Sequence, residues 1–112
     1  MESKRQQKIA RLLQKDLGEI FRIFANEIIS GYLITVTKVN VSPDLSVAKV
    51  YLSLFGPTDK QKVFNTINHH RKDIRHQLAT RVKAQLRVIP ELEFFIDDSL
   101  DYIENIDNLL KQ

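Results

Sequence analysis

The chain has 112 residues, a formal net charge of +3, 43 % apolar residues and no cysteine. This length suits one domain, and the composition is that of a folded protein rather than a disordered one. Without cysteine the chain forms no disulfide, thiolate metal site or cysteine nucleophile, which excludes a secreted disulfide scaffold.

The first predicted element is a helix from about Lys4 to Ile29, because apolar residues recur along it every three or four positions. Ser3 and Gln6 have the spacing of a capping box, and Ser30-Gly31 supplies a stop. The polar start differs from a signal peptide, and no stretch reaches the roughly 20 apolar residues that cross a bilayer. We therefore expect a cytoplasmic protein without a membrane partner.

Two strands are predicted next, at Tyr32–Val41 and Leu45–Leu54. The first is rich in β-branched residues, and the second alternates apolar with polar side chains. Ser42-Pro43-Asp44 has turn chemistry, so the two strands should pair as an antiparallel hairpin. Gly56-Pro57-Thr58-Asp59 then breaks the second strand and offers caps for a new helix.

Helical spacing resumes at Lys60, and Pro90 is predicted to end this helical stretch because proline disfavours helical geometry in the residue before it. The spacing is interrupted between Ile67 and Ile74. That interruption fits either a kink between two helices or a polar turn within one, and the sequence leaves both open.

The last two predicted elements are a half-buried strand at Glu91–Asp97 and a short closing helix at Asp98–Lys111. The resulting order is helix, strand, strand, helix, with or without a second helix, then strand and helix. This order predicts a single α+β domain over residues 1–112, with a three-stranded sheet and helices on one face.

Charge is distributed unevenly along the chain. Residues 60–87 hold eight lysines and arginines against one aspartate, whereas residues 91–112 hold seven acids against one lysine. Positive charge concentrated on a helical segment is typical of proteins that bind the phosphate backbone of nucleic acids. The alternative is an ordinary solvated helix face, because lysine and arginine are good helix formers.

Three blocks in the right order resemble signature segments of the bacterial ribosome-binding factor A family. They are the segment Val39 to Ser53, then Ile74-Arg75 with Leu78 and Ala79, and then the segment Leu86 to Leu100. The resemblance implies a type II KH-like fold. It also implies a role in late maturation of the small (30S) ribosomal subunit and in rRNA processing, through contact with the 16S rRNA of the immature particle.

One motif departs from that family. KH domains clamp nucleic acid with a Gly-x-x-Gly loop, and the family it resembles has an Ala-x-Gly kink where this chain reads His70-Arg71-Lys72. Glycine permits close approach of a backbone, so its absence favours side-chain contacts to RNA at this point. The predicted RNA-binding residues are His70, Arg71, Lys72, Arg75, Arg81, Lys83 and Arg87, with Lys4, Arg5 and Lys8 as a second candidate set.

No catalytic motif is present, so we expect a binding protein without catalytic residues, cofactor or small-molecule substrate. Asp97-Asp98 with Asp101 is interpreted as a helix cap rather than a metal site. The chain lacks heptads, which favours a monomer. An alternative function is a protein-interaction adapter without direct RNA contact, which would need an exposed apolar patch.

Overall fold

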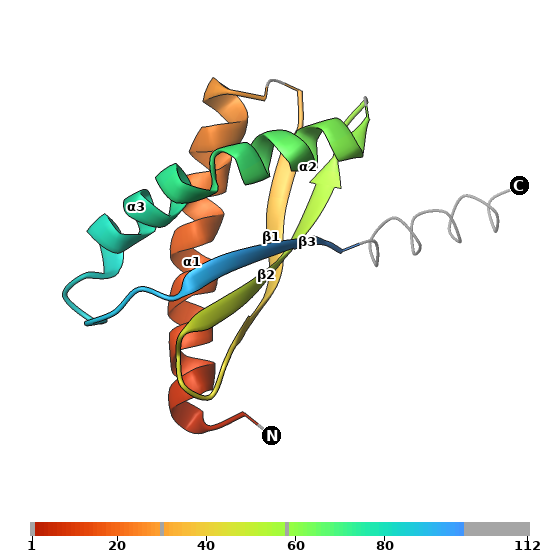
Figure 1. The fold of residues 1–112 in the computed structure, drawn as a ribbon. Coiled ribbons are helices and arrows are strands. Elements are labelled where there is room, and N and C mark those ends of the chain that lie inside the picture. The colour runs from red at the N-terminus through yellow and green to blue at the C-terminus, as the bar shows by residue number, and fades with distance from the viewer. Residues whose placement is uncertain (1, 30, 58, 98–112) are drawn as a thin grey trace, which may run out of the picture.

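The computed structural model describes residues 2–29, 31–57 and 59–97. Its elements in chain order are α1 (Lys4–Glu27), β1 (Leu33–Val41), β2 (Val47–Phe55), α2 (Lys60–His69), α3 (Arg71–Val82) and β3 (Glu91–Ile96) (Figure 1). The α+β class and the three strands are confirmed. The closing helix predicted at Asp98–Lys111 lies outside the described residues.

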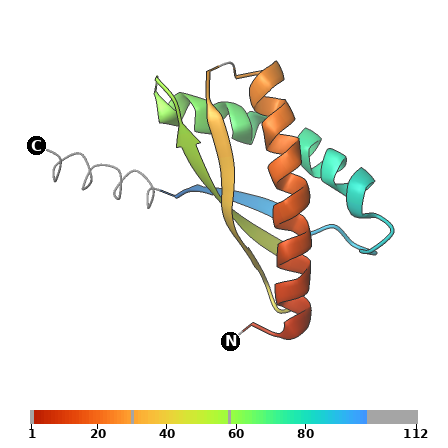
Figure 2. The ribbon, with the colours of Figure 1, turned by 180° about the vertical axis from the view of Figure 1, so that it is seen from behind.

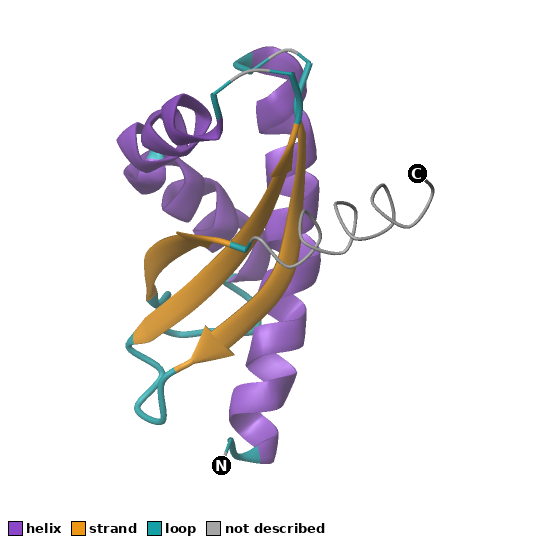
Figure 3. Ribbon diagram, turned by 90° about the vertical axis from the view of Figure 1, so that its right-hand side faces the viewer, coloured by secondary structure: helices purple, strands orange, loops and turns teal. Residues whose placement is uncertain are grey.

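The strands are ordered β1-β2-β3, with β1 antiparallel to β2 and β3 parallel to β2. A parallel neighbour cannot be reached through a tight turn, so α2 and α3 form the crossover that carries the chain back. Figure 3 shows the strands nearest the viewer with the three helices behind them, and Figure 2 shows α1 running along the strands. In the described part of the chain the helices therefore cover one face of the sheet, as predicted.

The core lies between this face and the helices. Residues spaced three or four apart on α1, such as Leu13, Leu17 and Phe21, are fully buried, and so are Val50 and Leu52 on β2. The crossover helices contribute the fully buried side chains Ile67, Ile74, Leu78 and Val82. Burying these side chains is the main driving force for assembling the helices on the sheet.

The start of α1 is a capping box, as predicted: the Ser3 hydroxyl accepts from the Gln6 amide, and the Gln6 side chain accepts from the Ser3 amide. Gln6 is also buried, and its Nε2 donates to the Val41 carbonyl at 2.9 Å. One side chain thus begins the helix and attaches it to β1. The helix ends at Glu27, and Gly31 has a φ of 90°, which glycine adopts without strain.

Strand β1 carries a β-bulge, because its pairing with β2 shifts register between Val36 and Lys38. The Nε2 of Gln14, on α1, donates to the carbonyls of Val36 and Thr37 at 3.2 and 3.4 Å. The Thr37 hydroxyl donates to Asp97 just after β3, at 2.5 Å. The bulge therefore connects α1 to the end of the third strand.

The predicted start of β2 at Leu45 is wrong by two residues. Leu45 has a φ of 64° and belongs to the turn, where the Ser42 hydroxyl accepts from the amides of Ser46 and Val47. These side-chain bonds keep residues 42–46 out of the strand ladder.

The prediction that Pro90 ends the second helical stretch is also wrong, since α3 ends at Val82 and the chain reaches β3 through a turn at residues 83–85 and a bend at residues 87–88. The amides of Gln85 and Leu86 both bond to the Val82 carbonyl and close this turn. Leu86 continues the helical spacing in the sequence because it is half-buried as well, although it is no longer on a helix. Apolar spacing alone does not distinguish a buried residue on a helix from a half-buried residue in the segment that follows it.

Replacing Gln6 with alanine should lower the free energy of unfolding by about 1–3 kcal/mol, because the helix cap and the bond to Val41 are both lost. Urea unfolding followed by circular dichroism measures this change. The control is Gln7→Ala, whose exposed side chain makes only a long bond of 3.4 Å to Glu2. Equal losses in the two variants would contradict the role given to Gln6.

Candidate nucleic-acid interface

The predicted RNA-binding cations do not form one continuous stripe. Arg71 and Lys72 lie at the start of α3, whereas Lys83 and Arg87 lie beyond its end. A helix of 12 residues is about 18 Å long, so these two groups are well separated. Arg75 and Arg81 lie between them on α3.

His70 is the break between α2 and α3, which resolves the alternative that the sequence left open. It is both the C-cap of α2 and the N-cap of α3, with φ −97° and ψ 13°. Its amide bonds to the carbonyls of Thr66 and Ile67. The ring nitrogen Nδ1 donates to the Thr66 carbonyl at 2.9 Å, and the ring meets Phe24 edge-on with centroids 5.3 Å apart. A negative φ needs no glycine, so the helices break here without the kink motif.

Arg71 and Lys72 are exposed in the first turn of α3. Among the described residues neither side chain forms an ion pair. No side chain caps this helix, so the positive end of its dipole lies here without a capping oxygen. The acidic residue of this turn, Asp73, accepts a bond from Gln77 at 3.1 Å. Two free cations and a helix start therefore combine at the α2–α3 junction, which is the arrangement that attracts phosphate.

The Arg75 side chain is engaged inside the protein. Its Nε and a terminal guanidinium nitrogen donate to the carbonyls of Pro90 and Ile89 at 3.1 and 2.6 Å, and it lies 3.6 Å from the Glu91 carboxylate. These bonds attach α3 to the segment that leads into β3. A contact of Arg75 with RNA stays a prediction, and the structure gives it a positioning role.

Arg81 is engaged as well. Its guanidinium lies 2.5 Å from the Glu19 carboxylate and 3.7 Å from that of Asp16, both on α1. These pairs join α3 to α1 on a partly exposed surface, where an ion pair contributes little stability. The predicted RNA contact of Arg81 would have to compete with them.

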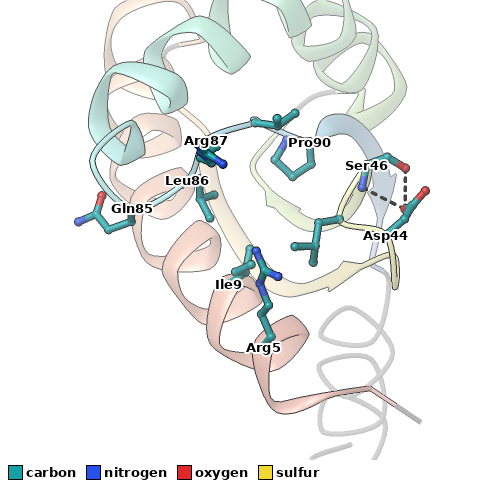
Figure 4. Close-up of a pocket in the computed structure, with 10 residues that line it drawn as sticks. Arg5, Ile9, Asp44, Ser46, Gln85, Leu86, Arg87 and Pro90 are labelled. Carbon is teal, nitrogen blue, oxygen red and sulfur yellow. Dashed lines mark hydrogen bonds between the residues drawn. The ribbon is translucent and has the colours of Figure 1, made fainter.

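Three of the remaining cations lie around two adjoining hollows at the other end of α3. Arg5 on α1 and Arg87 after α3 both line a hollow of about 550 Å³ (Figure 4). Lys8 lines an adjoining hollow together with Arg5. The structure thus brings one member of the main predicted set together with two members of the second set. Lys4 and Lys83 are exposed but line neither hollow.

Asp44 is the acidic residue at the rim of the first hollow. Its carboxylate accepts from the Ser46 and Ser42 hydroxyls, each at 2.7 Å, and from the Ser46 amide at 3.1 Å. Hydrogen bonds from Ser46, and then from Ser42, lower the pKa of this exposed carboxyl below its ordinary value. Asp44 is therefore occupied within its own turn, on the side of the hollow away from Arg5 in Figure 4.

The open face of the sheet holds a group that sequence reasoning missed. The rings of Tyr51 and Phe95 stack there with centroids 5.3 Å apart, and the Lys38 ammonium lies 6.0 Å from the Tyr51 ring. Residue spacing along the sequence does not reveal this group. Tyr51 and Phe95 become neighbours only through the parallel pairing of β3 with β2, and Lys38 lies beside Tyr51 through the pairing of β1 with β2.

Nothing in the described part of the chain suggests a metal or a membrane segment. Within residues 2–29, 31–57 and 59–97, no three histidine or acidic side chains converge as metal ligands would. The candidate cluster at Asp97, Asp98 and Asp101 lies largely outside these residues. None of the described helices has the length and apolar character that spanning a membrane requires.

Proteins of one known family are similar to this chain over nearly its whole length. The sequence model of the ribosome-binding factor A family matches residues 5–110. The ribosome-binding factor A of Cytophaga hutchinsonii is 42 % identical over 112 residues, which are 100 % of this chain and 84 % of that protein. The protein of the same name from Flavobacterium psychrophilum is 48 % identical over 112 residues, covering 98 % of this chain and 85 % of that one.

Two solved structures from Thermus thermophilus are similar in fold. The crystal structure of its ribosome-binding factor A has a TM-score of 0.67 at 24 % identity, covering 81 % of this chain and 94 % of that one. A homology model of the Thermus factor, fitted into a cryo-electron microscopy map of a 30S complex of ribosome-binding factor A, has a TM-score of 0.67 at 27 % identity, covering 80 % of this chain and 91 % of that one. The α+β arrangement is thus shared with known members of one family.

Replacing Arg75 with alanine should lower the free energy of unfolding by about 1–3 kcal/mol, because two carbonyls lose a charged donor. Arg81→Ala should cost at most about 1 kcal/mol, since its ion pairs are partly exposed. Arg71→Ala, the exposed control on the same helix, should change stability by less than about 0.5 kcal/mol. Urea unfolding of the three variants checks this order, and an Arg75 variant as stable as Arg71→Ala would refute it.

Proposed function

The chain belongs to the ribosome-binding factor A family, and we propose that it binds the immature small ribosomal subunit through 16S rRNA and acts in its late maturation and rRNA processing. Two findings support the small subunit as the partner: the chain belongs to this family, and the Thermus relative has been fitted into the map of a 30S complex. Residues 1–112 act in this proposal as a single KH-like domain, monomeric and cytoplasmic, without bond-making of its own.

The observation that carries the RNA contact is the α2–α3 junction. Arg71 and Lys72 are exposed there beside the uncapped start of α3, and no described acidic residue pairs with either. A phosphate held by these groups would release condensed counterions, which makes binding favourable and dependent on salt. Arg87, Arg5 and Lys8 provide a second group of cations at the far end of α3, and none of them is ion-paired within the described residues.

The proposed mechanism is differential affinity. A protein that binds one RNA conformation more tightly than another shifts the particle toward the first and leaves when the second forms. Side chains at two ends of a helix suit this purpose, because the phosphates they contact must be spaced to match the helix. A rearrangement of the RNA that changes this spacing would weaken one contact and release the protein.

The test compares two double variants that remove the same charge from opposite faces. Arg71→Ala with Lys72→Ala should weaken binding to purified immature small subunits and reduce the slope of log affinity against log salt by about two. Lys38→Ala with Lys49→Ala, on the open face of the sheet, should leave the slope nearly unchanged. Sedimentation binding assays over a salt series measure both, with mature subunits as the weaker-binding comparison.

Other outcomes would redirect the proposal. Equal slopes in the two variants would move the RNA contact away from the α2–α3 junction. Binding that is independent of salt would favour the adapter function, for which Leu33 and Phe55 offer a surface: they are 62 % and 54 % exposed and are paired across β1 and β2. Failure of the unchanged protein to bind either particle would refute the proposed function and leave the adapter function in its place.

A further inference from the structure

The hollow at the far end of α3 has features that phosphate attraction alone does not require. It lies between the first turns of α1, the β1–β2 turn and the segment that joins α3 to β3, and its volume is about 550 Å³. This is within the usual size of pockets for small ligands, roughly 300–1,000 Å³. Cations lie at its rim, and its lining includes the apolar side chains Ile9, Leu45, Leu86, Val88 and Pro90.

The apolar lining is accessible. Val88 is 72 % exposed, the highest exposure of any large apolar side chain in the described residues. Leu45 and Leu86 pack only partly into the core. The hollow therefore offers apolar surface that a flat ligand can cover, which is favourable in proportion to the area removed from water.

The rim is positively charged on the side of α1. Figure 4 shows the Arg5 side chain rising from the helix toward Ile9, with Arg87 at the upper edge. Among the described residues neither guanidinium has an ion-pair or hydrogen-bond partner, and Lys8 continues the charge into the adjoining hollow. Arginine suits such a place because its planar group both binds phosphate and stacks on bases.

We propose that this hollow holds one unpaired nucleotide of RNA, with the base on the apolar lining and the phosphate between Arg5 and Arg87. The proposal rests on the RNA-binding function above and adds to it a second, base-accepting site. Sequence-specific RNA recognition commonly uses unpaired bases of this kind.

An extended acidic peptide fits the hollow less well. Such a peptide would need free backbone groups to pair with, and those of Ser46 are already used. The Ser46 amide donates to Asp44 and Ser42, while its carbonyl accepts from the Glu91 amide at 2.9 Å. The compact shape and the rim charge instead match a single nucleotide.

The first experiment titrates the full chain with adenosine monophosphate and follows backbone amides by nuclear magnetic resonance. Shifts should be confined to the hollow, around residues 5–9, 45 and 85–88. Inorganic phosphate and adenosine alone should each bind at least fivefold more weakly, since each offers half of the proposed ligand. Arg5→Gln with Arg87→Gln should weaken binding at least fivefold, whereas Lys38→Ala with Lys49→Ala should not.

Three results would overturn the proposal. Resonance shifts at other residues would show that the nucleotide does not bind in the hollow. Inorganic phosphate that binds as tightly as the nucleotide would show that the hollow binds only an anion. Tighter binding of a hexapeptide of alternating glutamate and leucine would assign the hollow to a protein ligand. The glutamine variants remove only exposed side chains without described bonds, and circular dichroism confirms that they fold.

A second measurement separates this site from the proposed function. Binding of immature small subunits should weaken about tenfold in Arg5→Gln with Arg87→Gln. If only the Arg71 and Lys72 variant weakens this binding, the hollow proposal fails and the proposed function stands. If the unchanged protein binds no subunit but still takes up the nucleotide in the hollow, the proposed function fails instead.

Discussion

The parallel pairing of β3 with β2 is the constraint on which the rest of the molecule depends. Two parallel neighbours cannot be joined by a short turn, so the chain must return along the sheet before β3 can form. That return is made by α2 and α3, which bury apolar side chains on the same face that α1 covers. The charged sides of α2 and α3 are left facing away from the sheet, where the basic character of residues 60–87 becomes surface.

The basic segment has two roles that its composition does not distinguish. Arg75 and Arg81 bond to the α3–β3 segment and to α1, whereas Arg71 and Lys72 extend into solvent. Arg81 lies in the last turn of α3 and is still paired, so position along the helix does not decide whether a cation is engaged. Acceptors on α1 and on the α3–β3 segment hold Arg81 and Arg75, whereas among the described residues no such acceptor bonds to Arg71.

Local signals in the sequence are sufficient to predict most of the fold. The capping box at Ser3 and Gln6, the hairpin around Ser42-Pro43-Asp44 and the alternation in Glu91–Asp97 depend on neighbouring residues, and all three are confirmed. The predicted end of α3 is wrong because Leu86 is half-buried without being helical. The hollow and the Tyr51–Phe95 pair depend on contacts between distant segments, which spacing along one chain does not reveal.

The bulge in β1 has a consequence for self-association. An outer strand of a sheet presents a row of backbone groups on which another copy can add a strand, which is a common route to aggregation. In β1 the bulge at Thr37 interrupts that row halfway along. The carbonyls beside it accept from Gln14, and Val41 near the strand end accepts from Gln6, both on α1. Two glutamines of one helix thus occupy the positions at which a foreign strand would begin to pair.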